Sequence, residues 1–177
     1  MKTEFEVRVL EINHDEMVEK LESLGATKVF DALQERKVYD LNPVCENKWI
    51  RLRSNGKKTT LTIKDINAKT IDGTKELEVE VDSFEIMDKI LNELGYVSRS
   101  FQQNKRLQYN LDGVEVDLDS WPLIPEYMEI EGKSEEEVYK TLDKLGISRD
   151  EITTLDVESI YSSYGIEDIK HMKTLTF

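Results

Sequence analysis

Two glutamates near the start of the chain, Glu4 and Glu6, have a spacing that suits metal or phosphate chemistry. Alternate residues of an extended strand project from one face and lie about 6.5–7 Å apart. The two carboxylates would therefore lie side by side, with Arg8 next along the same face. Mg²⁺ and Mn²⁺ prefer oxygen ligands of this kind. The segment predicts a carboxylate pair that can present its oxygens to a metal cluster.

The same alternation recurs along the chain. Eight segments have the period of two that is typical of strands: 3–11, 35–41, 48–54, 58–64, 75–82, 105–111, 114–120 and 126–131. In seven of them the residues of one parity are mostly apolar and those of the other mostly ionic. The ionic parity includes Glu4, Glu6, Arg8, Arg51, Arg53, Lys64, Glu76, Glu78, Glu80, Arg106, Glu115, Asp117, Asp119, Glu129 and Glu131.

Two interpretations fit this alternation. An antiparallel sheet with one face in water alternates apolar and polar residues in the same way. Such a face usually mixes Thr, Ser, Lys and Gln, however, whereas here nearly every polar position carries a full charge of one sign or the other. The second interpretation is a closed barrel whose charged face lines the lumen. Eight strands enclose a cavity wide enough for one small ligand.

Helices are expected where apolar residues recur at helical spacing between a capping residue and a glycine. These segments are 14–24, 84–94 and 135–145, with a weaker fourth at 155–163. Their apolar stripes need an apolar sheet face to cover. We therefore predict an α+β fold over residues 1–177 as a single domain: an eight-stranded antiparallel barrel with a charged lumen and helices packed outside.

The composition argues against several classes of function. The chain has 24 basic and 37 acidic residues, a net charge of −13, which argues against binding to nucleic-acid duplexes or to an anionic membrane surface. Cys45 is the single cysteine, and neither a signal-peptide pattern nor a long apolar stretch is present. We expect a soluble, cytoplasmic protein, compatible with a homodimer.

Opposite charges confined in a lumen are costly unless they are paired or bind an ion. Basic side chains facing carboxylates suggest a ligand that satisfies both, namely a polyphosphate with its divalent metals.

These residues resemble those of the CYTH superfamily, the triphosphate tunnel metalloenzymes, over about residues 3–165. The family signature E-x-E-x-K reads Glu4-Phe5-Glu6-Val7-Arg8 here, and the later matches are Arg51-Leu52-Arg53, Leu61-Thr62-Ile63-Lys64, Glu76-Leu77-Glu78-Val79-Glu80, Arg106 with Tyr109, Asp119, and Glu129-Ile130-Glu131. The group includes class IV adenylyl cyclases, thiamine triphosphatases, and inorganic or RNA triphosphatases.

The resemblance implies a role for each matching residue. The implied ligands of Mg²⁺ or Mn²⁺ are Glu4, Glu6, Asp119, Glu129 and Glu131. The implied triphosphate-binding residues are Arg8, Arg51, Arg53, Lys64 and Arg106. Glu4, Glu6 and Arg8 form the implied catalytic group, and Glu78, Glu80 and Asp117 belong to the lumen network.

Two departures stand out. Arg8 replaces the usual lysine; it keeps the charge but is a poorer proton-transfer group. Asn104 occupies a position where family members often have a further lysine, so one basic contact is expected to be missing.

Trp121 is interpreted either as a base-stacking residue or as the anchor of a loop at the barrel mouth.

The implied partner is a small triphosphate. Phosphoryl transfer needs positioning and charge neutralisation more than covalent catalysis. We expect a metal-dependent triphosphatase acting on an inorganic, nucleotide or other organic triphosphate. The alternatives are a class IV-type adenylyl cyclase that makes cyclic AMP from ATP and a non-catalytic triphosphate sensor, because one cage can serve several reactions.

Overall fold

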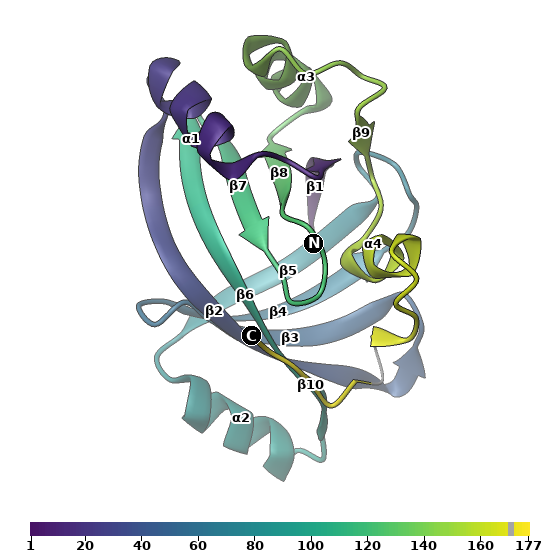
Figure 1. The fold of residues 1–177 in the computed structure, drawn as a ribbon. Helices are drawn as coiled ribbons and strands as arrows, with labels where there is room; N and C mark the ends of the chain where they lie inside the picture. The colour runs from purple at the N-terminus through teal and green to yellow at the C-terminus, as the bar shows by residue number, and fades with distance from the viewer. Residues whose placement is uncertain (170–171) are drawn as a thin grey trace.

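The computed structural model describes residues 1–169 and 172–177. Eight antiparallel strands close into a barrel (Figure 1), which confirms the predicted fold class. They are β1 (Lys2–Leu10), β2 (Thr27–Cys45), β3 (Lys48–Ser54), β4 (Thr59–Ile66), β5 (Thr74–Val81), β6 (Ser98–Leu111), β7 (Val114–Ser120) and β8 (Tyr127–Gly132). Their order is β6-β2-β3-β4-β5-β1-β8-β7, and pairing of β7 with β6 closes the ring.

Two short strands that the sequence did not predict extend this sheet. β9 (Ile152–Thr153) pairs with β1, and β10 (Thr174–Leu175) pairs with β6 in the parallel direction.

β2 and β6 are longer than predicted. β2 begins at Thr27 rather than at residue 35, and β6 begins at Ser98 rather than at residue 105. Twelve residue pairs join them, from Thr27 opposite Asn110 to Tyr39 opposite Ser98. The added halves carry polar residues on both faces, so the expected alternation is missing there. Backbone pairing with a long partner strand outweighs this local composition.

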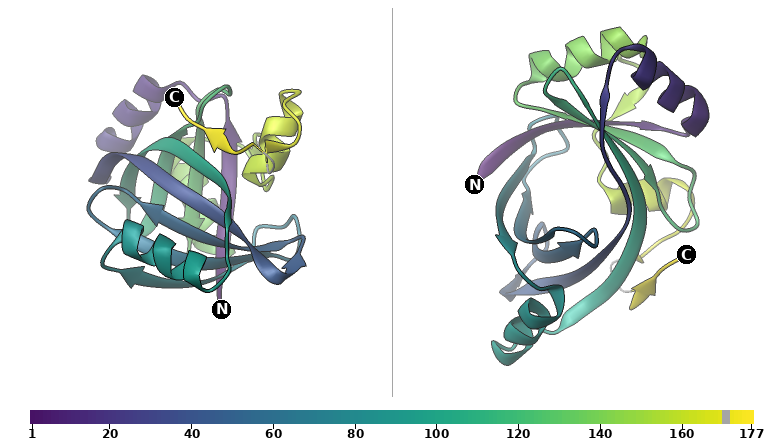
Figure 2. Two further views of the ribbon diagram at one scale, coloured as in Figure 1. Left: turned by 90° about the horizontal axis from the view of Figure 1, so that it is seen from below. Right: turned by 90° about the vertical axis from the view of Figure 1, so that its left-hand side faces the viewer.

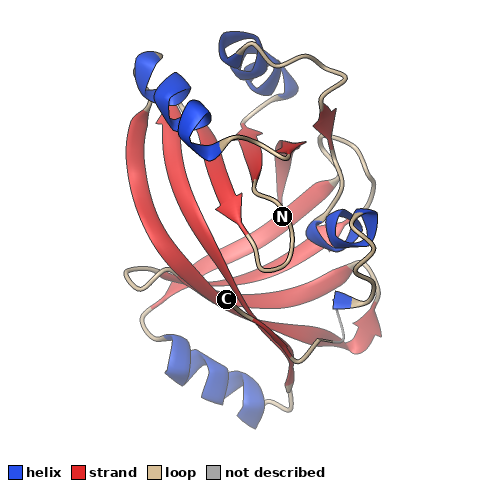
Figure 3. Ribbon diagram, viewed as in Figure 1, coloured by secondary structure: helices blue, strands red, loops and turns tan. Residues whose placement is uncertain are grey.

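In the residues that the structure describes, four α-helices lie outside the barrel (Figures 2 and 3). They are α1 (His14–Ser23), α2 (Phe84–Glu93), α3 (Glu135–Leu145) and α4 (Val157–Ser163). α4 begins two residues later than predicted because the Asp156 carboxylate accepts a hydrogen bond from the Ser159 amide at 2.8 Å and caps the helix.

The helices cover most of the apolar outer face, as expected. Leu21 of α1 and Leu142 of α3 pack with Val7, Val116 and Ile130 of β1, β7 and β8.

α2 covers a second part of the outer face, where Leu91 packs on Tyr39, Ile50 and Leu52 of β2 and β3. The outer face of β5 lacks the expected cover, because Leu77 and Val79 are 58% and 56% exposed. In the described part of the chain, every helix is too short or too polar to cross a membrane.

The barrel closes unevenly. β1 pairs with β8 along six residues but with β5 along only three, where Lys2, Thr3 and Glu4 lie opposite Glu76, Lys75 and Thr74.

The covered and uncovered parts of the outer face should differ in their contribution to stability. Leu52 of β3 is fully buried under α2, so Leu52→Ala should lower the free energy of unfolding by about 2–5 kcal/mol. The matched control Leu77→Ala on β5 should change it by less than about 0.5 kcal/mol. Urea denaturation followed by circular dichroism measures both. Equal losses would contradict the observed packing.

Candidate functional site

A cavity of about 820 Å³ lies inside the barrel and is lined by residues of the barrel strands and of the start of α4. Most predicted site residues line it: Glu4, Glu6, Arg8, Arg51, Arg53, Lys64, Glu78, Arg106, Glu129 and Glu131. Three do not: Glu80, Asp117 and Asp119.

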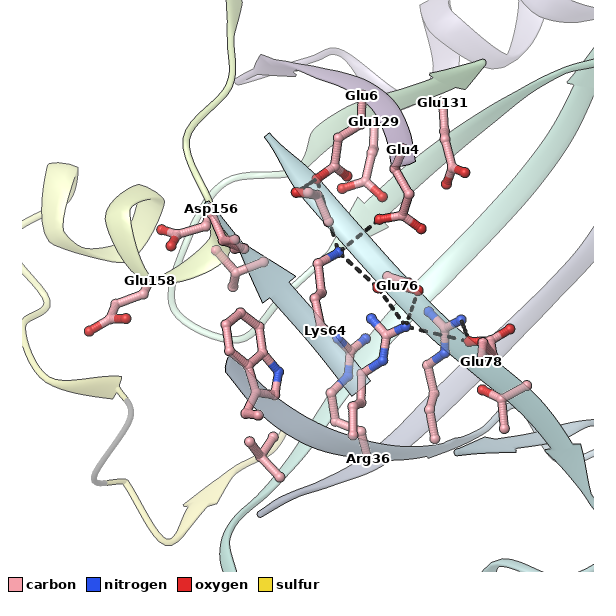
Figure 4. A pocket seen from close by; sticks show the side chains of 18 of the residues that line it. Glu4, Glu6, Arg36, Lys64, Glu76, Glu78, Glu129, Glu131, Asp156 and Glu158 are labelled. Carbon is pink, nitrogen blue, oxygen red and sulfur yellow. Dashed lines mark hydrogen bonds and ion pairs between the residues drawn. The ribbon is translucent and has the colours of Figure 1, made fainter. Parts of the chain in front are cut away.

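One side of the cavity is acidic. This acidic wall consists of Glu4, Glu6, Glu129 and Glu131 (Figure 4). Glu6 lies directly opposite Glu131 across β1 and β8, a like-charged pair that is unfavourable without a cation nearby. Burial, together with the carboxylates of Glu76 and Glu131, raises the pKa of Glu4 to about 8 although Lys64 Nζ lies 3.4 Å away. Burial and neighbouring carboxylates also raise the pKa of Glu131 to about 7.

Arg8 forms ion pairs with two glutamates of the acidic wall. Its guanidinium donates to Glu6 Oε2 at 3.0 Å and to the Leu155 carbonyl at 2.9 Å, and Nη2 lies 2.5 Å from Glu129 Oε2. Burial opposes ionisation of Glu129, but the charges of Arg8 and Arg106 outweigh it and hold the pKa of that carboxyl well below its usual range. Arg8 therefore neutralises part of the acidic wall.

The facing side of the cavity is basic. This cationic wall consists of Arg36, Arg51, Arg53 and Lys64, from β2, β3 and β4. In Figure 4, Arg36 lies on the other side of the cavity from the four glutamates of the acidic wall, whereas the Lys64 side chain extends across toward Glu4, 3.4 Å from its Nζ.

Glu76 of β5 is the main counter-ion of the cationic wall. Its carboxylate lies 3.1 Å from Lys64 Nζ and 3.2 Å from Arg51 Nη2. Burial opposes ionisation, but Arg51 and Lys64 lower the pKa of Glu76 to about 2. The sequence assigns Glu76 to the charged face of its strand but does not predict it as a site residue. Its position two residues before Glu78 was the available signal.

Arg106 is held by carboxylates that lie outside the cavity lining. Its Nε and Nη2 donate to the two oxygens of Asp119 at 2.8 and 2.5 Å, and Nη1 donates to Asp117. Asp119 is fully buried and also accepts a hydrogen bond from Asn104 at 3.0 Å. The structure thus places Asp119, predicted as a metal ligand, against Arg106 instead of on the acidic wall.

Glu80 and Trp121 also lie differently from some expectations. The Glu80 carboxylate is 64% exposed and pairs with Lys58 at 3.4 Å at the outer end of β5, away from the lumen network predicted for it. Trp121 is buried, its ring packs edge-on against Tyr161, and the Arg36 guanidinium lies 4.5 Å from the ring centroid. Of the two interpretations, this packing is that of a loop anchor.

The donor set can be tested against a divalent metal. Among the described residues, no three acidic, histidine or cysteine side chains already form a metal cage. The acidic wall nevertheless offers hard oxygen donors, and Glu4 and Glu131 have the least compensated charge in it, as their raised pKa values indicate. The wall fits Mg²⁺ or Mn²⁺ in donor chemistry and in charge.

Comparison with solved structures identifies similar folds. A conserved hypothetical protein from Pyrococcus furiosus is 22% identical with a TM-score of 0.74, covering 89% of this chain and 99% of that chain. A candidate adenylate cyclase from Vibrio parahaemolyticus is 14% identical with a TM-score of 0.75, covering 91% and 98%. A candidate adenylyl cyclase from Hippeastrum, described as having a dominant triphosphatase activity, is 16% identical with a TM-score of 0.62, covering 97% and 100%.

Comparison with curated protein sequences gives no match. The family model described as the CYTH domain matches residues 44–158, which include the basic residues of β3 and β4 and both glutamates of β8, whereas β1 lies outside the matched range. This match spans more than half of the chain, and the barrel with its charged lumen agrees with it, so the protein belongs to the CYTH domain family.

Proposed function

We propose that this protein hydrolyses a triphosphate in a reaction that depends on a divalent metal ion. The observation that carries the proposal is the division of one cavity into an acidic wall and a facing cationic wall. A triphosphate carries many negative charges, and its metal ions carry the opposite charge. A cavity with both kinds of wall complements that pair better than it complements a simple anion.

The basic residues have the geometry to bind phosphate oxygens. Arg51, Arg53 and Lys64 line the cavity, and the Glu76 carboxylate beside Arg51 and Lys64 fixes the positions of those two. Arg106 is fixed from behind by Asp119 in a two-pronged arrangement. Charge-assisted hydrogen bonds from such held donors are the strong ones in proteins, and they would orient the phosphoryl groups without reorganisation.

The acidic wall would hold the metal. Glu4, Glu6, Glu129 and Glu131 are the residues proposed for this, with Arg8 positioning Glu6 and Glu129. A bound Mg²⁺ or Mn²⁺ supplies charge neutralisation on phosphate and lowers the pKa of an attacking water. Asp119 is proposed instead to position Arg106, because Arg106 and Asn104 already occupy its oxygens.

Hydrolysis is favoured over cyclisation by what surrounds Trp121. A cyclase must hold a nucleoside so that its hydroxyl reaches the α-phosphorus. Trp121 lines the cavity but is only 4% exposed, because Arg36 covers one face of its ring and Tyr161 contacts it edge-on, so this ring offers little surface for a base. A site that recognises its substrate through the phosphate groups, and not through a base, suits a triphosphatase.

The reaction can be identified from its products. The protein should release phosphate from tripolyphosphate with Mg²⁺ or Mn²⁺, and excess chelator should abolish the release. The assay offers tripolyphosphate and ATP in parallel and resolves phosphate, pyrophosphate and cyclic AMP by chromatography. Cyclic AMP as the main product from ATP would replace the proposal with a cyclase. Tight binding with no product and either metal would replace it with a sensor.

The acidic wall can be tested with charge-neutral variants of the same size. Glu6→Gln and Glu131→Gln each remove one anionic oxygen ligand, so each should raise the Mg²⁺ concentration for half-maximal activity by at least about 10-fold. Glu80→Gln is the matched control, because Glu80 is exposed and does not line the cavity, and it should behave as the wild type. Phosphate release against Mg²⁺ concentration measures all three. Unchanged metal curves for both cavity variants would remove these carboxylates from the metal site.

A further inference from the structure

Arg36 and Arg53 form a like-charged pair inside the barrel. The two residues lie directly opposite each other on β2 and β3, and both line the cavity. Like charges at directly opposed positions of a sheet destabilise the fold. Such a pair therefore needs either a carboxylate from the chain or an anion from elsewhere.

The described part of the chain supplies little of that negative charge. The carboxylate nearest to Arg53 is Glu78, at 3.9 Å, and no described carboxylate lies within 4 Å of Arg36. Arg36 donates instead to the uncharged side chains of Gln34, at 3.4 Å, and Asn104. Its Nε is buried and has no hydrogen-bond partner among the described residues. By contrast, Arg51 is paired with Glu76, and Arg106 with Asp119.

Burial and the neighbouring positive charges both lower the pKa values of the two arginines. Burial and the nearby charges of Arg51 and Arg106 lower the pKa of Arg53 to about 10. Burial and the charges of Arg51, Arg53 and Arg106 hold the pKa of Arg36 well below its usual range. The surroundings of this pair are thus more positive than the chain itself balances, and a bound anion would relieve the imbalance.

Arg36 is also held in place for a ligand. The Trp121 ring packs against its guanidinium, and Trp121 is fixed by the edge contact with Tyr161. The Tyr161 hydroxyl donates to the Pro122 carbonyl at 2.6 Å, which fixes this loop to α4. A guanidinium braced in this way loses little conformational entropy when it binds an anion.

The position of the pair fixes the part of the ligand that it would contact. In the strand order of the barrel, β2 and β3 lie across from β1 and β8, which carry the acidic wall. Asn104 of β6 occupies the position where the family resemblance predicts a lysine. The Arg36 guanidinium, from the neighbouring strand β2, donates to the Asn104 side chain and so supplies a positive charge at that position.

We propose that Arg36 and Arg53 form an anion subsite that binds the polyphosphate at its end away from the acidic wall. The identity of the ligand rests on the proposed function, whereas the subsite itself rests on this pair. Arg36, which the sequence did not single out, is then an additional substrate-binding residue. The reacting phosphoryl group would lie nearer the acidic wall.

Binding without turnover tests the subsite independently of catalysis. In excess chelator, calorimetric titration with tripolyphosphate should show affinity at least about 10-fold weaker for Arg36→Gln than for the wild type, the loss typical of a charge-assisted contact. Arg36→Lys, which keeps the charge but loses the planar fork, should fall between them. Arg149→Gln is the charge-matched control, because Arg149 pairs with Asp143 on the exterior, and it should bind within twofold of the wild type.

Two further measurements guard against a merely structural effect. The melting temperature of ligand-free Arg36→Gln should equal or exceed that of the wild type, because the change removes an unbalanced charge. In steady-state hydrolysis with Mg²⁺, the variant should raise KM for tripolyphosphate with little change in kcat. Unchanged affinity in chelator, or a loss of kcat with KM unaltered, would overturn the subsite. A wild type that binds tripolyphosphate but releases no phosphate would overturn only the proposed hydrolysis.

Discussion

The burial of ionised side chains in a closed barrel is the constraint on which this structure depends. Charges removed from water must be balanced by partners, because the desolvation cost of each is several kcal/mol. Glu76 balances the positive charges of Arg51 and Lys64, and Arg8 balances the negative charges of Glu6 and Glu129. The balance fails in opposite senses on the acidic wall and at the Arg36–Arg53 pair. A polyanion with its metal ions would correct both imbalances at once.

The barrel architecture allows many charges to be buried while the fold keeps an apolar layer. In an antiparallel barrel, alternate residues face inward, so one strand supplies several charges to the lumen while its other face joins an apolar layer. Val7 packs under α1 and α3, whereas its neighbours Glu6 and Arg8 face the cavity. The long pairing of β2 with β6 brings Arg36 beside Asn104 and the loop of Trp121. The outer packing and the inner chemistry therefore share the same strands.

Much of this could be read from the sequence, because alternation reports directly which residues share a face. The parity of Glu4, Arg51 and Lys64 correctly predicted the lumen. Partners could not be read in the same way, since the pairing of Asp119 with Arg106 depends on strand register. Parity also does not report depth along a strand, and for that reason Glu80 was expected in the lumen although it lies at the outer end of β5. Arg36 escaped notice although it lies in the predicted strand 35–41, because charged and apolar residues are mixed on both faces of that segment.

The uneven closure of the barrel has a mechanical consequence. The three-residue ladder between β1 and β5 is a seam, and side chains of the site help to hold it: Thr74 donates to Glu6 at 2.9 Å, and Lys64 reaches Glu4. The Glu6 amide also donates to the Ile71 carbonyl in the loop before β5. Local opening takes least free energy where the fewest backbone pairs must break, so the amide protons of this seam should exchange with solvent before those of β2 and β6. A polyanion that drew Lys64 away from Glu4 would remove one of these contacts, so binding in the cavity would be coupled to local opening of the barrel wall.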